Sequence, residues 1–322
     1  MVLPRVGIVS PARPGSNTGN ARTAERWARL LAGKARVTVL TAYRGEPLEL
    51  LIALHARRSA EAVAAWAGRG PAIVVLTGTD LYRDIAIDAQ AQRSLELADA
   101  LIVLQEQGVA ALPRSLRRKA RVVYQSSPAR QALPRTARHL RAVMVGHLRD
   151  EKDPRTFFEA ARRLRDRDDI LLDLVGGSLD PALAREARAT ARACPRFRWL
   201  GPQEHEATLK RIARAHLLVS CSRMEGGAHV VLEAVRARTP VLASRIDGNL
   251  GMLGKGYRGY FAPGDAGALA QLLVHCREQP RILSRLAAQC RARDPRFEPA
   301  RERQLLVQLI HSLLQSTTEQ PR

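Results

Sequence analysis

The chain has 322 residues, enough for about two domains with well-filled cores. Hydrophobic residues make up 46% and charged residues 26%, as in an ordinary soluble globular protein. The formal net charge is +21 at pH 7, and of the 52 basic residues five are lysines and 47 are arginines. These arginines are spread along the chain rather than gathered in one tract. They fit an enzyme of anionic substrates, non-specific nucleic-acid binding at low salt, or a biased base composition of the coding gene.

Several classes of protein are disfavoured by the composition. No apolar run reaches the ~18 residues that a membrane-spanning helix needs. The four cysteines form no CxxC pair, so we expect neither a disulfide framework nor a zinc site. Aromatic residues at 4% leave little for base stacking. The first residues, MVLPRVGIVSPARPG, resemble a strand and a loop rather than a signal peptide, and we expect a cytoplasmic protein.

The first strand, residues 6–10, is followed by a loop rich in glycine and asparagine and by a helix over residues 23–33. Strand, glycine loop and helix is the arrangement that cradles phosphates. The loop matches neither GxGxxG nor GxxxxGK[ST], which disfavours a dinucleotide cofactor or a P-loop. Gly15 and Gly19 are therefore candidates for binding a diphosphate at the helix start.

Further buried strands alternate with helical patterns up to about residue 140, which predicts a parallel, doubly wound domain. Strands are expected at residues 36–42, 48–56 and 72–82, and in LADALIVLQ and RVVYQSS. Polar and basic residues collect where these strands end, and a histidine there is either structural or catalytic. The candidates are Arg13, His55, Arg57, Arg58, Thr79, Asp80 and Arg83.

The connector PARQALPRTARHLR predicts a domain boundary near Arg138, giving domains over residues 1–138 and 139–300 and a terminal helix and tail over 301–322. The second domain starts with a strand to Val145 and a loop that holds Gly146, His147, Arg149 and Lys152. Residues 246–265 read as a glycine-rich loop and turn region.

Residues 217–244 form one βαβ pattern whose loop lies at the carboxyl end of its first strand, where open α/β sheets bind ligands. Gly226 and Gly227 precede the helix, so backbone N–H groups can approach an anion there. Glu225 and Glu233, eight residues apart, suit a hydroxyl-rich ligand because carboxylates accept hydrogen bonds. A diphosphate flanked by two sugars satisfies all of these groups. The alternative is a simple turn followed by a solvated helix residue.

The motifs VGHLRDEKDPRTFFEAARRL and E-GGAHVVL-E, followed by TPVLAS, resemble the signature of family-4-like nucleotide-sugar glycosyltransferases. The resemblance implies the GT-B fold, two Rossmann-like doubly wound parallel-sheet domains facing a cleft, with no metal and no cofactor. It implies that Lys152 binds the donor diphosphate, Glu233 the ribose hydroxyls and Glu225 the donor sugar. Backbone N–H groups would come from Gly226, Gly227 and Ala228, and Gly146 is a further predicted donor-binding residue. His147 replaces the family's usual arginine, and Arg149 is the candidate to take over its contact.

In the first domain, SPARPGSNTGN, LLIALHARRSA and VVLTGTDLYRD resemble the selenosugar synthases of selenoneine biosynthesis. That resemblance implies transfer of a sugar from UDP-N-acetylglucosamine or UDP-glucose to selenophosphate, giving a 1-selenosugar while UDP and phosphate leave. Selenophosphate is an ionised nucleophile at neutral pH, so it needs positive charge more than a general base.

We therefore expect Arg57 and Arg58, with Arg13 and Arg83, to bind selenophosphate near Thr79 and Asp80, while His55 orients a substrate. His55, Lys152 and Glu225 are the predicted catalytic residues. One alternative is a family-4-like transferase acting on a lipid or polysaccharide hydroxyl, which should carry an apolar patch on its first domain. Another is a basic nucleic-acid-binding protein without catalysis. The sequence carries no signal for an oligomeric state or for stable membrane association.

Overall fold

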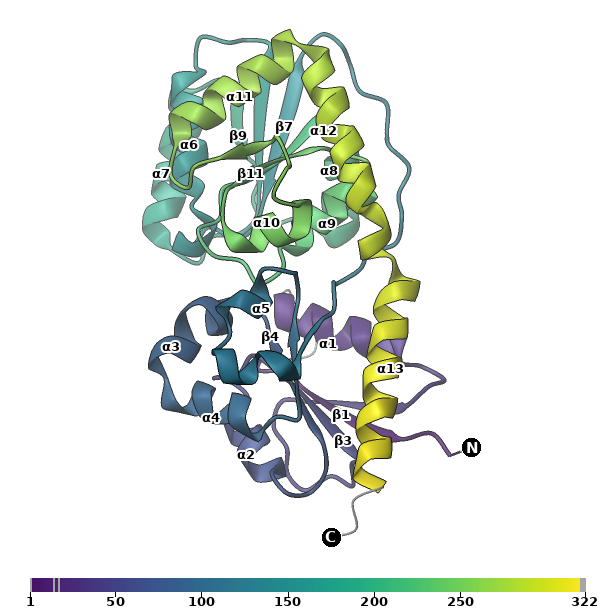
Figure 1. The fold of residues 1–322 in the computed structure, drawn as a ribbon. Coiled ribbons are helices and arrows are strands. Elements are labelled where there is room, and N and C mark those ends of the chain that lie inside the picture. The colour runs from purple at the N-terminus through teal and green to yellow at the C-terminus, as the bar shows by residue number, and fades with distance from the viewer. Residues whose placement is uncertain (1, 14, 17, 319–322) are drawn as a thin grey trace. The chain divides into compact units, whose positions relative to one another are not determined.

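The structure is a computed structural model that describes residues 2–13, 15–16 and 18–318 (Figure 1). The chain divides into two compact units, one made of the residues up to Ser126 with those from Glu298 onward, the other of Ser127–Phe297. The division falls eleven residues before the boundary expected near Arg138. The terminal helix is part of the first unit, where a separate segment over 301–322 was expected.

The first unit is built on a six-stranded sheet whose neighbouring strands all pair in parallel, in the order β2-β1-β3-β4-β5-β6. The order reverses between β1 and β3, so the loops that follow these two strands diverge at the carboxyl edge and leave room for a ligand. The strands are β1 (Arg5–Val9), β2 (Arg36–Leu40), β3 (Leu50–Leu54), β4 (Ala72–Leu76), β5 (Ala100–Val103) and β6 (Ala120–Val122).

Helices accompany this sheet, and the longer ones bury apolar residues, such as Trp27 and Trp66. The helices are α1 (Gly19–Leu30), α2 (Ala60–Trp66), α3 (Ile85–Ile87), α4 (Ala89–Leu97), α5 (Gly108–Ala111) and α13 (Pro299–Thr318), with a π-helical turn η1 (Asp80–Asp84) and a 3-10 turn η2 (Arg114–Lys119). Helix α13 returns to this unit (Figure 1). Its Leu306 and Ile310 belong to the same core cluster as Trp27 and Ile52.

A buried carboxylate fixes α13 to the first unit. Glu302 is 1% exposed and accepts hydrogen bonds from Trp27 Nε1 at 2.6 Å and Ser126 Oγ at 2.5 Å. It also pairs with Arg26, whose Nε lies 3.1 Å from Glu302 Oε2. An ionised carboxylate is retained in a core only when it is paired and hydrogen-bonded, as here. The C-terminal helix is therefore an integral part of the first unit.

The second unit has its own six-stranded parallel sheet, in the order β12-β11-β10-β7-β8-β9. This is the Rossmann order, with the reversal between β7 and β10. The strands are β7 (Leu140–Val145), β8 (Ile170–Val175), β9 (Phe197–Trp199), β10 (Leu217–Ser220), β11 (Val241–Ser244) and β12 (Tyr260–Phe261). The predicted fold class, α/β with two Rossmann-like parallel sheets, is confirmed.

The helices of the second unit are α6 (Pro154–Arg163), α7 (Pro181–Ala193), α8 (His205–Arg214), α9 (His229–Arg236), α10 (Asp247–Leu253), α11 (Ala266–Glu278) and α12 (Pro280–Arg293), with 3-10 turns η3 (Asp150–Lys152) and η4 (Asp294–Phe297). The segment expected as a glycine-rich loop over residues 246–265 begins instead with α10. Of the described helices, none is long and apolar enough to cross a membrane.

Candidate functional site

The predicted donor residues of the second unit follow the two strands at which its strand order reverses. Gly146 and the turn η3 come after β7, and the loop with Glu225 comes after β10. Because β7 and β10 are parallel neighbours, their carboxyl ends lie at one edge of the sheet. Two loops from distant parts of the sequence therefore meet at the position where such sheets bind ligands.

Lys152 and Glu225 contact each other directly at this edge. Lys152 Nζ donates to Glu225 Oε1 at 2.5 Å, and Ser222 Oγ donates to the same oxygen at 2.6 Å. The side chains of Lys152 and Glu225 are 17% and 11% exposed, so the pair lies in a largely desolvated position. Charge interactions are weakly screened in such a position, so the lysine attracts an incoming anion while the paired carboxylate opposes it.

The two loops are also joined through their backbones. The Arg223 amide donates to the Glu151 carbonyl at 2.9 Å, and Arg223 Nε lies 3.2 Å from Asp153 Oδ2. Asp153 adopts the left-handed conformation at φ 45°, so the chain can turn from η3 directly into α6. These contacts hold together the two loops that carry Lys152 and Glu225.

Helix α10 packs against the backbone of this site. A Cβ added to Gly248 would lie 2.2 Å from the Glu225 carbonyl oxygen, so no larger residue fits there without movement. Ser244 Oγ donates to the Ser222 carbonyl at 2.5 Å, and Asn249 Nδ2 donates to the Ser244 carbonyl at 2.9 Å. The end of β11 and helix α10 thus support the loop that carries Glu225.

Glu233 lies inside α9 and is 5% exposed, contrary to the solvated helix residue of the alternative interpretation. Its Oε1 lies 3.5 Å from His229 Nε2 and 3.7 Å from His205 Nε2, at the starts of α9 and α8. Ala228 is the residue before α9, and Gly226 and Gly227 come directly before it, so these three residues form the approach to the helix start.

Two further predicted donor residues flank this group. Gly146, at φ 156°, is close enough to Lys152 that an added Cβ would lie 3.6 Å from its aliphatic carbons. Arg149 is about half exposed, with its Nε 3.9 Å from Glu151 Oε2. His147, which replaces the family's usual arginine, is half-buried beside Gly177. Arg149 is therefore more accessible to a ligand than His147.

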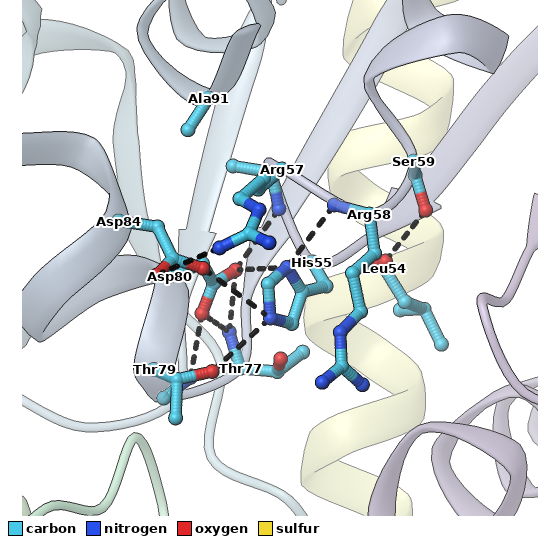
Figure 2. A network of polar contacts seen from close by, with 12 residues as sticks. Leu54, His55, Arg57, Arg58, Ser59, Thr77, Thr79, Asp80, Asp84 and Ala91 are labelled. Carbon is cyan, nitrogen blue, oxygen red and sulfur yellow. Dashed lines mark hydrogen bonds and ion pairs between the residues drawn. The ribbon is translucent and has the colours of Figure 1, made fainter. Parts of the chain in front are cut away.

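In the first unit, the predicted residues at the ends of β3 and β4 form one polar network (Figure 2). Asp80 is fully buried and accepts hydrogen bonds from the backbone amides of Ala56, Thr77 and Gly78 at 2.8–3.2 Å. One carboxylate thus links the loops after two neighbouring strands. The π-helical turn that starts at Asp80 is a rare conformation that is frequent at functional sites.

His55 is the centre of this network, is 3% exposed and has the unusual φ of 75°. Its Nδ1 accepts a hydrogen bond from the Arg58 amide at 3.3 Å, and its Nε2 lies 3.1 Å from Thr79 Oγ1. Burial lowers the pKa of His55 below its usual value, although the Asp80 carboxylate acts in the opposite direction. We infer a neutral ring that carries its proton on Nε2 and donates it to Thr79.

The arginines of this cluster differ in their partners. Arg57 Nη1 lies 3.7 Å from Asp84 Oδ1 and its Nε 3.5 Å from Asp88 Oδ2, while Arg83 Nε donates to Asp84 Oδ1 at 3.0 Å. The Arg58 guanidinium extends away from these carboxylates (Figure 2). Arg58 and Arg13 are exposed, and neither guanidinium pairs with a carboxylate of the described residues.

Gly15 and Gly19 do not form a ready phosphate cradle. The Gly15 amide donates to Glu25 Oε1 at 2.8 Å, so it is occupied, and by a carboxylate that would repel an anion. Gly19 is the first residue of α1, where Thr18 caps the helix by accepting from the Ala21 amide. Both glycines belong to the first unit, whereas Lys152 and Glu225 belong to the second.

Sequence reasoning missed several residues that shape these sites: Ser222, Gly248, Asp84 and Asp88. Ser222 donates to Glu225 within the same loop, but no motif marked it, and Gly248 of α10 contacts the Glu225 backbone across 23 residues of sequence, which no local pattern reveals. The two aspartates had a local signal, because they follow the predicted Asp80 at intervals of four residues, the spacing of one helix face. Among the described residues, no three of histidine, cysteine, aspartate or glutamate are grouped so as to hold a metal ion.

Two Rossmann-like parallel sheets, each carrying polar loops at its point of strand reversal, define the GT-B class of α/β proteins. The chain belongs to the family described as glycosyl transferases group 1, whose model matches residues 125–291. That match covers nearly all of the second unit, including the Lys152 and Glu225 loops and helix α9.

Solved structures share this fold over most of the chain. Alr3699/HepE from Anabaena in complex with UDP has a TM-score of 0.78 and 16% identity, over 97% of this chain and 100% of that chain. Sucrose-phosphate synthase from Thermosynechococcus elongatus has a TM-score of 0.77 and 18% identity, with the same coverage. A mutant of TarM from S. aureus has a TM-score of 0.66 and 12% identity. The match covers 81% of this chain, and this chain spans only 55% of the TarM chain. At these identities the similarity shows a shared fold.

Proposed function

We propose that the protein is a glycosyltransferase that moves a sugar from a UDP-sugar, UDP-N-acetylglucosamine or UDP-glucose, to selenophosphate and forms a carbon–selenium bond. The observation that carries the donor half of this proposal is the Lys152–Glu225 contact at the strand reversal of the second sheet. It puts a cation for a diphosphate beside a carboxylate for sugar hydroxyls, the two groups that a nucleotide sugar requires.

UDP as the leaving group is supported by the structures that share the fold. Alr3699/HepE has been solved in complex with UDP-glucose, and a pneumococcal O-GlcNAc transferase, GtfA, in complex with UDP and GlcNAc. In our proposal Lys152 binds the diphosphate and stabilises the charge that develops on it as the bond to the sugar breaks. The buried Glu233 binds the ribose hydroxyls, with His229 and His205 beside it.

The acceptor half rests on the His55 cluster of the first unit. Both ring nitrogens of His55 already have protein partners, so the ring is poorly suited to remove a proton from a hydroxyl acceptor. An ionised nucleophile such as selenophosphate requires no such base. Arg58 and Arg13, which pair with no described carboxylate, would bind its phosphoryl oxygens. Thr79, which accepts from His55, retains its own O–H to donate to the same anion.

The reaction balances without an oxidant, a metal or a cofactor. The selenium lone pair attacks the anomeric carbon, the bond from that carbon to the diphosphate oxygen breaks, and UDP leaves with the electron pair. The product carries a selenium–phosphorus bond, and water then cleaves that bond to give phosphate and the 1-selenosugar. Both leaving groups are anions, in keeping with the chain's strongly basic character.

The test mixes the full chain with UDP-N-acetylglucosamine or UDP-glucose and freshly prepared selenophosphate, and follows UDP release and product mass. We expect UDP and a selenium-containing sugar in equal amounts. UDP release with hydroxyl acceptors but not with selenophosphate would replace this proposal by an ordinary sugar transfer. If no donor gives UDP or a glycosylated product, the proposal is overturned altogether.

A further inference from the structure

A second group of cations lies in the second unit, around a cavity of about 900 Å³. Arg141 is the second residue of strand β7 and His216 comes directly before β10, so this part of the wall lies at the amino ends of the strands. The Lys152 and Glu225 loops follow the carboxyl ends of the same two strands. Six cationic side chains and a single carboxylate, that of Glu204, line the cavity: Arg135, Arg141, Arg198, Lys210, Arg211 and Arg214.

Three of these arginines converge on one buried carboxylate. Asp173 is 0% exposed and lies within 2.8–3.3 Å of the guanidinium nitrogens of Arg141, Arg198 and Arg211. One negative charge thus faces three positive charges, which leaves two in surplus. The arginine side chains remain 24%, 47% and 30% exposed, so each can also contact a ligand.

The other three cations add to the surplus. Arg135 Nη2 donates to the carbonyls of Ala213 and Arg238 and to Thr239 Oγ1, all neutral acceptors, and its Nε is buried without a hydrogen-bond partner. Burial also lowers the pKa of Arg135, as expected where a cation has no counter-ion. Lys210 and Arg214 are exposed and pair with no carboxylate of the described residues.

We propose that this cavity binds a small polyanion with at least two phosphate groups, separately from the donor residues at the opposite edge of the sheet. A concave site of several hundred Å³ is the size that takes a small molecule, whereas a flat basic surface would suit a membrane or a nucleic acid. One guanidinium group can donate two parallel hydrogen bonds to two oxygens of a phosphate. Several arginines that converge on one cavity therefore favour a ligand with more than one phosphate group. The proposal stands independently of the sugar-transfer reaction.

The test uses inorganic tripolyphosphate as the probe, titrated into the full chain by calorimetry at 150 mM KCl. We expect a saturable site, distinct from any binding at Lys152, whose affinity falls about tenfold or more in the double variant Lys210→Glu/Arg214→Glu, since two attractive charges become repulsive. The Lys152→Ala variant should retain this site with the affinity of the parent. ATP competing for the same site would indicate a nucleotide ligand, and its failure to compete would indicate an inorganic or sugar-borne polyphosphate.

The matched control is Arg281→Glu/Arg285→Glu, two exposed positions of α12 that change the net charge by the same amount. Equal losses in both double variants would overturn the proposal, because the general positive field would then explain the binding. Loss in Lys152→Ala, absence of saturable binding, or binding to phosphatidylglycerol vesicles without tripolyphosphate competition would overturn it too. Circular dichroism confirms that each variant is folded.

Discussion

At the scale of single residues, the contact between Lys152 and Glu225 determines what each side chain can do for a donor. The two groups are paired in the structure at 2.5 Å, so a diphosphate that approaches Lys152 also approaches the Glu225 carboxylate. The lysine attracts the diphosphate and the glutamate repels it. In the proposed reaction we therefore assign Glu225 to the sugar end of the donor.

We predict opposite effects on UDP binding for the two residues. Lys152→Ala should lower the affinity for UDP by roughly tenfold or more, which corresponds to the loss of one charged hydrogen bond. Glu225→Gln should leave UDP binding unchanged or tighter, because it removes a negative charge, while sugar transfer falls sharply. Calorimetric titration with UDP measures the first effect and turnover the second, with Glu186→Gln on the surface as the control. Weaker UDP binding in Glu225→Gln would contradict these roles.

The two neighbouring arginines of the first unit should likewise behave differently. Arg57 is held by Asp84 and Asp88, whereas Arg58 has no such partner among the described residues. We expect Arg58→Ala to raise the KM for selenophosphate by about tenfold or more with little change in stability. Arg57→Ala should affect the KM much less. The KM is measured from initial rates at saturating donor. An equal increase of the KM in both variants would show that pairing with Asp84 and Asp88 does not determine which arginine binds the acceptor.

His55 makes the first unit sensitive to acid. Its pKa is lowered from 6.5 in the folded chain by burial, so above pH 6.5 the ring is neutral in both the folded and the unfolded state and its contribution to stability is fully retained. As the pH falls below 6.5, the unfolded chain takes up the proton first, and stability declines until the folded ring is also protonated. Asp80 and Asp84 favour the proton and Arg58 opposes it.

Replacing His55 with asparagine, which tolerates a positive φ, should remove this part of the pH dependence. The difference in stability between parent and His55→Asn should change by up to about 1.4 kcal/mol per pH unit as the pH falls through the window below 6.5. Urea unfolding at a series of pH values measures it. Stability profiles that stay parallel at every pH would contradict a neutral buried ring.

At the scale of elements, helix α10 supports the Glu225 loop but was not predicted from the sequence. Four glycines in eleven residues suggested a loop, yet this segment forms a helix against the Glu225 backbone. Glycine is costly in a helix, but at Gly248 it is required because the Glu225 carbonyl occupies the space of a side chain. Tertiary packing, rather than local propensity, decided the conformation.

Gly248→Ala should therefore damage the donor site without changing any polar group. The added methyl would lie 2.2 Å from the Glu225 carbonyl oxygen, and overpacking of this kind costs about 1–3 kcal/mol. We expect lower stability in urea unfolding and lower turnover. Gly256→Ala is the matched control, since an added Cβ there meets nothing within 4 Å. Two variants of equal stability and turnover would show that α10 does not support the loop.

At the scale of the whole molecule, buried strands were predictable because each is a short apolar run that ends in a polar loop. The strand run to Val145 and the run at 217–220 predicted a second series of strands and helices, and the resemblance of its motifs to known glycosyltransferases implied the Rossmann-like sheet. The units themselves were harder to delimit. Helix α13 joins the first unit through the buried Glu302, a contact across 275 residues of sequence that no local pattern contains. The pairing of Arg57 with Asp84 and Asp88 was hidden for the same reason.

The chain's basic character also has a local explanation at this scale. Many arginines are engaged in specific networks, such as the three on Asp173 and the pair at Asp84, rather than forming one uniform field. Positive charge is left in surplus at only a few of the sites described above. Those sites, and not the net charge, indicate where anions should bind.

The most direct test of the proposed reaction detects the new bond itself. A UDP-sugar labelled with carbon-13 at its anomeric carbon is converted in the presence of selenophosphate, and the product is observed by nuclear magnetic resonance. Formation of a carbon–selenium bond predicts selenium-77 satellites on the labelled carbon signal, in step with UDP release. A labelled product that lacks these satellites, with the anomeric carbon bonded to oxygen, would contradict the proposal.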